Sequence, residues 1–162
     1  KNAKFLFIDG TPDKEEDKIG KSFVSAKGDL FDKMLNAIKL KKNDIFIVNA
    51  IPWRPPGNRY PTAEEIKICR PFIFNLIKLL RPKIIVCLGE ISTNQILHLN
   101  QSFIKTRGKW HSLKSNPIND FDDEYNPYVL PTLNISYLLT RPDMKRQAWE
   151  DMKLLRDKIR EI

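Results

Sequence analysis

The chain has 162 residues, 41% hydrophobic and 30% charged, with a formal net charge of +8. We expect residues 1–162 to form a single domain with a substantial core, and the basic charge favours a polyanionic partner. Two cysteines, Cys69 and Cys87, are too few for a disulfide framework. Because no apolar run approaches the roughly 20 residues of a membrane span, we expect a cytoplasmic protein of a bacterial-type cytosol or nucleoid, without membrane association.

Four short apolar runs, each followed by turn-forming residues or a helical pattern, predict four strands. The predicted strands are residues 4–8, 45–48, 83–88 and 128–133. Helical patterns alternate with these runs. The sequence therefore predicts an α/β fold whose parallel sheet is covered by helices on both faces.

Apolar residues at helical spacing predict four helices. The first is expected to begin at Gly28-Asp29 and the second to extend from Thr62 to about Leu80. The third is expected from Ile91 to Leu99, and the fourth after Arg141-Pro142-Asp143. Thr62 and Glu65 form a capping-box pattern, and the wide apolar stripe of that helix, which includes Phe72 and Leu79, predicts burial. Residues 13–27 are predicted as a polar loop. Residues 100–128 give little pattern, and the acidic segment 116–127 is expected to be mobile.

Three predicted strands end in unusual loops, after Ile8, Val48 and Leu133. Parallel strands bring such ends to one rim, and ligands of open α/β sheets bind beyond the carboxyl ends of the strands. The Asn49 amide offers both a donor and an acceptor, which suits the edge of a nucleobase. The rim is therefore predicted to form a nucleotide-handling pocket. Its expected residues are 9–17, Phe23, Asn49, the proline-rich loop and 134–141.

Three segments of the chain resemble the family 4 uracil-DNA glycosylases. They are DGTPDKEEDKIGKSFVSAKGDLFDKML, NAIPWRPPGNRYPTAEEIKICRPF together with IIVCLGE, and LPTLNISYLLTRPDMKRQAWEDM. The block from Arg54 to Arg59 is long and specific. The resemblance implies a three-layer α/β/α domain around a central four-stranded parallel sheet. It also implies a monomeric DNA N-glycosylase that flips uracil from single- or double-stranded DNA and hydrolyses its N-glycosidic bond in base excision repair.

The resemblance assigns roles to individual positions. Phe23 matches the aromatic side chain that stacks on the flipped uracil. The alternative is a core residue, but the polar loop around Phe23 favours the pocket. Asn49 matches the amide that reads the Watson–Crick edge, and the alternative, a turn cap, is weaker because prolines follow. Asn58 and Arg59 match a loop near the DNA. Tyr137, Leu138 and Leu139 match a loop that wedges into the duplex, an assignment that fails if these residues are buried core.

Basic side chains around the rim are expected to contact phosphates. They are Arg54, Arg59, Arg107, Lys109, Arg141, Lys145 and Arg146. Each alone is better explained as a solvated surface residue, and only the set beside the pocket favours DNA.

The chain departs from the family pattern at the reacting groups. The first motif normally reads Gly-Glu-Ala-Pro-Gly, so the water-positioning glutamate falls on Gly10, which otherwise matches a residue lining the substrate. Glu16 matches an acidic family residue, and Asp9 and Asp13 are the other candidates to hold the water. Asn134 replaces the histidine that donates to uracil O2, although its amide retains a donor.

The cofactor pattern also differs. Family 4 members commonly hold a [4Fe-4S] cluster through four cysteines. Here only Cys69 matches a ligand position, Trp53 stands in place of its partner, and no cysteine precedes residue 69. We expect no metal and no cofactor, with Trp53 packed into the space of the cluster.

Three alternatives stay open. Because Gly10 and Asn134 both differ from the family, the domain is either an active enzyme or a module that binds DNA or uracil without cleavage. A glycosylase of altered base preference is the second alternative. A nucleotide-binding protein unrelated to DNA is the third, and it would leave the proline-rich block unexplained.

Overall fold

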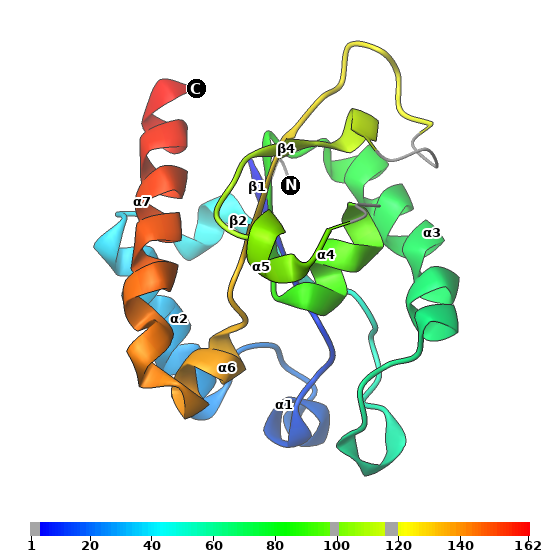
Figure 1. Cartoon of the computed structure of the whole chain (residues 1–162), viewed down its shortest axis with the longest axis vertical. Coiled ribbons are helices and arrows are strands. Elements are labelled where there is room, and N and C mark those ends of the chain that lie inside the picture. The colour runs from blue at the N-terminus through cyan, green and yellow to red at the C-terminus, as the bar shows by residue number, and fades with distance from the viewer. Residues whose placement is uncertain (1–3, 98–100, 116–119) are drawn as a thin grey trace.

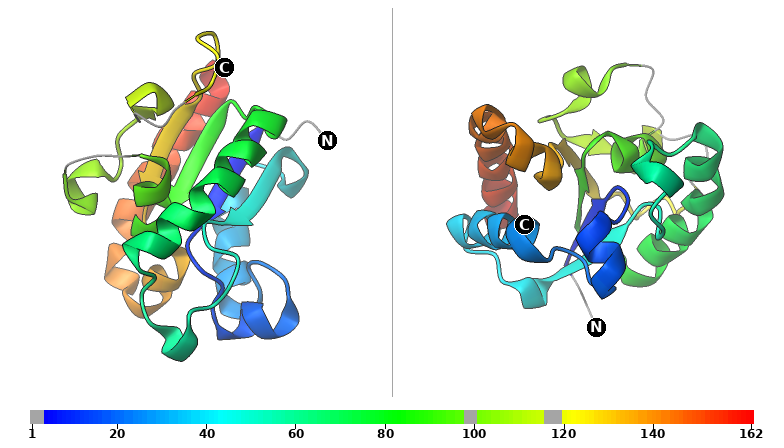
Figure 2. Two further views of the ribbon diagram at one scale, coloured as in Figure 1. Left: turned by 90° about the vertical axis from the view of Figure 1, so that its right-hand side faces the viewer. Right: turned by 90° about the horizontal axis from the view of Figure 1, so that it is seen from below.

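A mostly parallel sheet lies between two layers of helices in the computed structural model, which describes residues 4–97, 101–115 and 120–162 (Figures 1 and 2). The strands are β1 (Phe5–Asp9), β2 (Ile45–Asn49), β3 (Ile84–Leu88), β4 (His111–Ser112) and β5 (Tyr128–Thr132), in the sheet order β2-β1-β3-β5-β4. The four longer strands are parallel, as predicted. The two-residue β4 adds an antiparallel edge beside β5. It is too short to produce a recognisable sequence pattern.

Seven α-helices connect and cover the described strands. They are α1 (Lys14–Ile19), α2 (Ser25–Ala37), α3 (Ala63–Leu80), α4 (Glu90–Ile96), α5 (Phe103–Thr106), α6 (Ile135–Thr140) and α7 (Lys145–Glu161). Short 3-10 turns occupy 42–44, 56–58, 113–115 and 142–144. Among the described residues, no helix is both long and apolar enough to cross a membrane.

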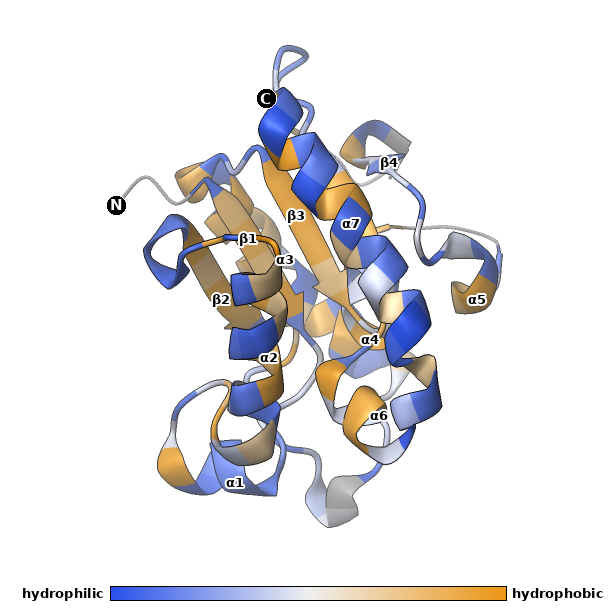
Figure 3. Cartoon of the chain, turned by 90° about the vertical axis from the view of Figure 1, so that its left-hand side faces the viewer, coloured by the Kyte–Doolittle hydropathy of each residue, from blue (hydrophilic) through white to orange (hydrophobic). Residues whose placement is uncertain are grey.

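Strand side chains alternate between two buried layers. Phe5 and Phe7 of β1 pack in the core beneath α2, α6 and α7. Leu6 and Ile8 pack in the opposite core, beneath α3 and α4. Figure 3 shows the hydrophobic strands lying beneath α2 and α7. This alternation decides which face of the sheet each residue at a strand end joins.

The segment 13–27, predicted as a loop, contains a helix and the start of another. Asp13 caps α1 through a capping box with Glu16, a short-range signal that the sequence interpretation missed. Helix α2 begins at Ser25, before the predicted start at Gly28. Gly28 is required by a close approach, because a Cβ there would lie 2.1 Å from the carbonyl oxygen of Phe23.

Helix α3 confirms the predicted boundaries but corrects the predicted burial. Thr62 and Glu65 form the expected capping box. Phe72 and Leu79, however, are 73% and 84% exposed, because only one side of α3 faces the sheet and its outer side meets no further layer. Helix α4 begins at Glu90, one residue before the predicted start. It ends at Ile96, and Leu97 is already extended, so the predicted end at Leu99 is wrong. Residues 116–119, part of the segment predicted to be mobile, lie outside the described residues.

Candidate functional site

The rim at the carboxyl ends of the parallel strands gathers several predicted site residues. Asp9 and Asn49 end the neighbouring strands β1 and β2 and are register partners. By strand alternation both side chains lie on the face that holds Phe7 and Ile47. Phe23 belongs to the same core. These three residues from separate segments therefore lie on one side of the sheet, as the sequence predicted.

A buried ion cluster lies behind this rim. The Lys27 Nζ atom is 2.5 Å from Asp9 Oδ2 and 2.7 Å from Glu16 Oε1, and each of the three residues is at most 3% exposed. Burial raises the pKa of the Asp9 carboxyl, against the opposing effect of Lys27. Burial alone would lower the pKa of Lys27, but the two carboxylates outweigh it, so the Lys27 pKa lies above its ordinary value. Lys27 is thus a buried cation.

The carboxylates proposed to hold water already have protein partners. Glu16 accepts hydrogen bonds from the backbone N–H groups of Asp13 and Phe23 as well as from Lys27. Asp13 accepts from the Glu16 backbone as the cap of α1. Asp9 is bonded to Lys27 and to Asn134. Of the three, only Asp9 contacts a residue that also lines a pocket, namely Asn134.

Asn134 combines a capping role with a place at the site. Its Oδ1 accepts from the backbone N–H groups of Ser136 and Tyr137, which caps α6. Its Nδ2 donates to Asp9 Oδ1 at 3.0 Å and, more weakly, to the Leu88 carbonyl at 3.4 Å. The side chain is half-buried. Donation to a bound base therefore requires one of these two bonds to be exchanged.

Phe23 is packed more tightly than its polar neighbourhood predicted. The side chain is 7% exposed, and its ring stacks on Phe31 with centroids 4.2 Å apart and planes 13° apart. The Lys27 Nζ atom lies 5.0 Å from the ring centroid. In this state Phe23 is a core residue at the edge of the rim, and the predicted stacking role stays a prediction.

Asn49 differs from its neighbours because part of its side chain has no partner. It is half-buried, and its Oδ1 is buried without a hydrogen bond to any residue that the structure describes. A buried acceptor of this kind is costly unless a ligand or water satisfies it. The side-chain oxygen of Asn49 is therefore available to accept a hydrogen bond from an N–H donor.

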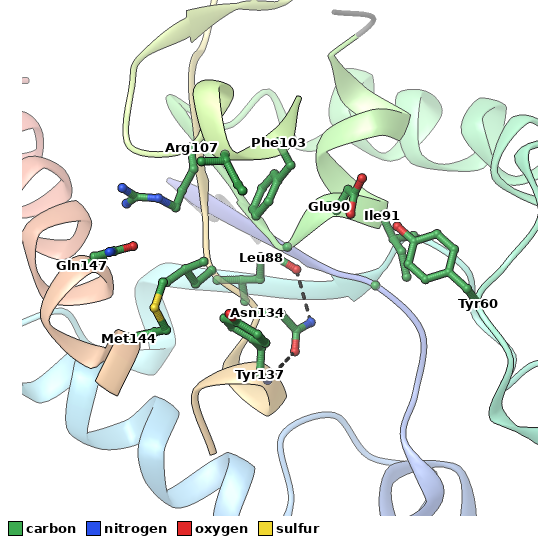
Figure 4. Close-up of a pocket in the computed structure, with 14 residues that line it drawn as sticks. Tyr60, Leu88, Glu90, Ile91, Phe103, Arg107, Asn134, Tyr137, Met144 and Gln147 are labelled. Carbon is green, nitrogen blue, oxygen red and sulfur yellow. Dashed lines mark hydrogen bonds between the residues drawn. The ribbon is translucent and has the colours of Figure 1, made fainter. Parts of the chain in front are cut away.

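A cavity of about 590 Å³ opens beside Asn134 (Figure 4). Gly10 lines it, and a Cβ at this position would meet Ile91 Cδ1 at 3.1 Å. Tyr60 and Glu90 lie near each other in the same view, and burial, with a smaller contribution from Glu90, raises the pKa of Tyr60 to about 12. The remaining lining residues are Leu88, Gly89, Ile91, Phe103, Ile104, Arg107, Leu133, Asn134, Tyr137, Met144 and Gln147.

Several predicted phosphate ligands are held by carboxylates. Arg107 Nη1 lies 2.7 Å from both Asp151 carboxylate oxygens, in a largely buried pair. Arg59 pairs with Glu65 and Arg141 with Asp143, both at the surface. Arg54 is half-buried, and the side chain of Asn58 lies outside the described residues. The surface pairs can exchange a partner for phosphate at little cost, whereas Arg107 cannot.

The predicted wedge requires a correction. Residues 137–139 lie on α6, where Tyr137 and Leu139 are each 39% exposed and Leu138 is 1% exposed. Leu138 packs in the core beneath α2 and α7, because helical geometry directs it inward. Leu138 therefore does not contact DNA, and only Tyr137 and Leu139 face outward.

The described residues do not fit an iron–sulfur cluster. Cys69 is buried against Ile51 and Ile66, whereas Cys87 lies within β3 in the core beneath α3. No group of three or more potential metal ligands occurs among residues 4–97, 101–115 and 120–162. Trp53, predicted to pack into the space of the cluster, is 41% exposed, so that packing is not observed.

Sequence reasoning missed Lys27 as a site residue. The signal was present, because Lys27 precedes Phe31 by four residues and Leu35 by eight, which places it on the buried stripe of α2. A lysine on an apolar stripe needs a buried anionic partner. Asp9 and Glu16 are those partners.

The chain is an α/β/α domain in which polar side chains at the carboxyl rim of a parallel sheet lie next to an apolar cavity, the usual position of a ligand site in such folds. A family model described as the uracil DNA glycosylase superfamily matches residues 1–153. The chain belongs to this superfamily, which confirms the resemblance and the fold expected from the sequence.

Curated relatives agree with this assignment. The chain is 34% identical over 160 residues to a type-4 uracil-DNA glycosylase of Sulfurisphaera tokodaii, covering 96% of this chain and 70% of that protein. It is 33% identical over 162 residues to the Saccharolobus solfataricus type-4 enzyme, covering 97% and 72%. For the Thermotoga maritima type-4 enzyme the identity is 32% over 155 residues, covering 94% and 76%.

Proposed function

We propose that this chain removes uracil from DNA by hydrolysing the N-glycosidic bond, the first step of base excision repair. The observation that carries this function is the similarity to type-4 uracil-DNA glycosylases over nearly the whole chain. The unpartnered Asn49 oxygen supports it, because the N3–H group of uracil is a donor that this buried acceptor lacks.

In the proposed reaction the bond between C1′ and the base nitrogen breaks, and its electron pair leaves with the base. Asn49 accepts from N3–H, and the Asn134 amide donates to the carbonyl on which negative charge develops. Water adds to C1′ and loses a proton, and the departed uracil anion takes up a proton, so the products are the abasic sugar and neutral uracil. Asp9 is the carboxylate best placed to orient that water, because it contacts Asn134, whereas Asp13 and Glu16 serve the α1 cap and the Phe23 backbone.

The proposed DNA surface surrounds the mouth of the cavity. Tyr60, Ile104 and Tyr137 line the cavity and are exposed, which suits stacking with nucleotides next to the extruded one. Arg59 and Arg141 supply positive charge that is only loosely paired. A monomer provides all of these groups, so we expect one chain to bind single-stranded or double-stranded DNA.

We also propose that the activity needs no iron–sulfur cluster. Cys69 is the one cysteine near the proline-rich loop, and Cys87 belongs to a different core. Iron analysis and a visible absorption spectrum of the anaerobically purified chain test this. Stoichiometric iron and sulfide would contradict it.

A uracil-containing single-stranded oligonucleotide tests the enzymatic function. Incubation with the chain is expected to produce abasic sites, detected as strand breaks after alkali treatment, while the matched thymine oligonucleotide stays intact. No abasic product at a large excess of protein would reject the glycosylase function.

A second candidate function, binding without cleavage, is favoured by Gly10, which lines the cavity but has no side chain at the position of the family's water-positioning glutamate. In that case the wild-type chain binds uracil-containing DNA without turnover, and Gly10→Glu combined with Asn134→His creates activity. Ile91 has to shift slightly to admit the Gly10→Glu side chain. Loss of the Asn134 cap costs about 1 kcal/mol of stability, so folding of the double variant is checked by thermal melting. A folded but inactive double variant would count against this second function.

A further inference from the structure

The two faces of the Phe23 ring are occupied in different ways. Phe31 lies parallel to the ring with centroids 4.2 Å apart, and so covers one face. The Lys27 ammonium lies over the same ring, 5.0 Å from its centroid. Because Phe31 already covers one face, we infer that the ammonium lies over the other. Since Phe31 closes one face to a ligand, a base that stacks on this ring has to use the face assigned to Lys27.

The position of the ammonium is fixed by buried partners. Asp9 and Glu16 hold Nζ, and Glu16 also accepts from the Phe23 backbone N–H at 2.7 Å. One carboxylate therefore ties the lysine to the segment that bears the ring. Because Lys27 is only 3% exposed, water contributes little to holding the charge.

The spacing does not admit a base between the ring and the ammonium. Van der Waals contact on both faces of a planar base requires two separations of about 3.5–4 Å, or roughly 7 Å in total. The observed separation is 5.0 Å. The large cavity beside Asn134 does not reach this space, since neither Phe23 nor Lys27 lines it.

We propose that Lys27 is a specificity-determining residue that occupies the base-binding face of Phe23 and must move before a pyrimidine stacks there. This inference rests on the proposed function, in which Phe23 stacks the extruded base. The base that displaces the lysine presents an edge with an N–H donor for the unpartnered Asn49 oxygen. That edge belongs to uracil-type pyrimidines.

Two variants separate the space that Lys27 fills from the charge that it carries. Lys27→Ala removes both the charge and the bulk. Lys27→Met removes the same charge and leaves the same carboxylates unpaired, but it fills the site. Binding of free uracil to each variant and to the wild-type chain is measured by isothermal titration calorimetry, after thermal melts confirm folding. If either variant fails to fold, the comparison is made with Asp9→Asn added to both.

Lys27→Ala is expected to bind uracil at least 10-fold more tightly than the wild-type chain and Lys27→Met. Equal affinity of the alanine and methionine variants, or a wild-type affinity as high as that of Lys27→Ala, would overturn the inference. The readout is independent of turnover. If the wild-type chain releases uracil from DNA but the two variants bind free uracil equally, the role of Lys27 is rejected and the proposed function stands. If Lys27→Ala binds free uracil tightly but the wild-type chain gives no abasic product, the cleavage function is rejected and the role of Lys27 stands.

Discussion

Asn49 and Arg107 differ in how far the folded protein already uses their polar atoms. Asn49 leaves a buried oxygen without a partner, whereas Arg107 is engaged by both oxygens of Asp151. Removing the Asn49 side chain is expected to remove a hydrogen-bond acceptor for the proposed ligand. Removing the Arg107 side chain is expected to break an ion pair that stabilises the fold. The two residues therefore predict opposite patterns of activity and stability.

Asn49→Ala is expected to reduce the rate of uracil excision roughly 10- to 100-fold. The reason is that one hydrogen-bonding group of the base is left unsatisfied, which costs about 1–3 kcal/mol. Its unfolding free energy is expected to change little. Single-turnover rates and urea denaturation provide the two measurements. Asn75→Ala, an exposed amide on α3, is the matched control and should alter neither. An Asn49→Ala protein as active as wild type would exclude Asn49 from base recognition.

Arg107→Ala is expected to lower the unfolding free energy by roughly 3 kcal/mol at pH 7, because it leaves the buried Asp151 carboxylate unpaired. Burial already raises the pKa of Asp151. A raised carboxyl pKa favours the protonated form in the folded state, so the loss should shrink as pH falls through the pKa of Asp151. Arg141→Ala, which breaks an exposed pair, should cost less than about 1 kcal/mol. Equal losses in the two variants would contradict the buried role of Arg107.

At the scale of elements, short helices decide which side chains reach solvent. The hydrophobic residues 137–139 suggested a continuous wedge, but α6 turns Leu138 inward and its two neighbours outward. The same geometry leaves Phe72 and Leu79 of α3 outside the core. For α3 the sequence predicted the helix correctly, and for α6 it predicted two of the three outward-facing residues. In both helices the direction of each side chain depended on which neighbours the helix packs against.

Leu138→Ala is expected to destabilise the protein by about 2–5 kcal/mol, the range for removing a buried leucine side chain. Leu139→Ala, an exposed change of the same size on the same helix, should remain within about 0.5 kcal/mol of wild type. It should instead weaken duplex binding. Chemical denaturation and fluorescence anisotropy with duplex DNA distinguish the two, and the reverse pattern would restore Leu138 as the wedge.

The cap of α3 predicts a pH dependence. Hydrogen bonds from Arg59 and from the Thr62 backbone lower the pKa of Glu65 to about 2. A lowered carboxyl pKa stabilises the fold above the unfolded-state value near 4.5, and that stabilisation is lost as pH falls toward 2. Glu65→Gln is therefore expected to lower stability at pH 7, with a difference from wild type that narrows below pH 4.5. Glu64→Gln, in the same helical turn but outside the capping box, is the matched control for the loss of one carboxylate.

For the whole molecule, the periodicity of the sequence predicted the strands and the shared rim. It did not predict most contacts between side chains that are far apart in the sequence. The four parallel strands, the α3 cap and the common rim of Asp9 and Asn49 follow from local patterns. The partners of Lys27 come from two other segments, so their meeting depends on tertiary packing. The Arg107 pair with Asp151 was hidden for the same reason. The Asn134 cap is a short-range bond, and it was missed because an amide that could bind a ligand equally suits a helix cap.

The sheet order gives Asp9 and Asn49, on the two sides of the proposed base site, unequal support. Strand β1, which bears Asp9, is bonded to β2 and β3, whereas β2, which bears Asn49, is an edge strand bonded only to β1 among the strands that the structure describes. An edge strand opens at lower free energy than a central one. Amide protons of β2 should accordingly exchange with deuterium sooner than those of β1. The strand that carries the proposed base-reading amide can thus open more easily than the strand that holds Lys27 through Asp9.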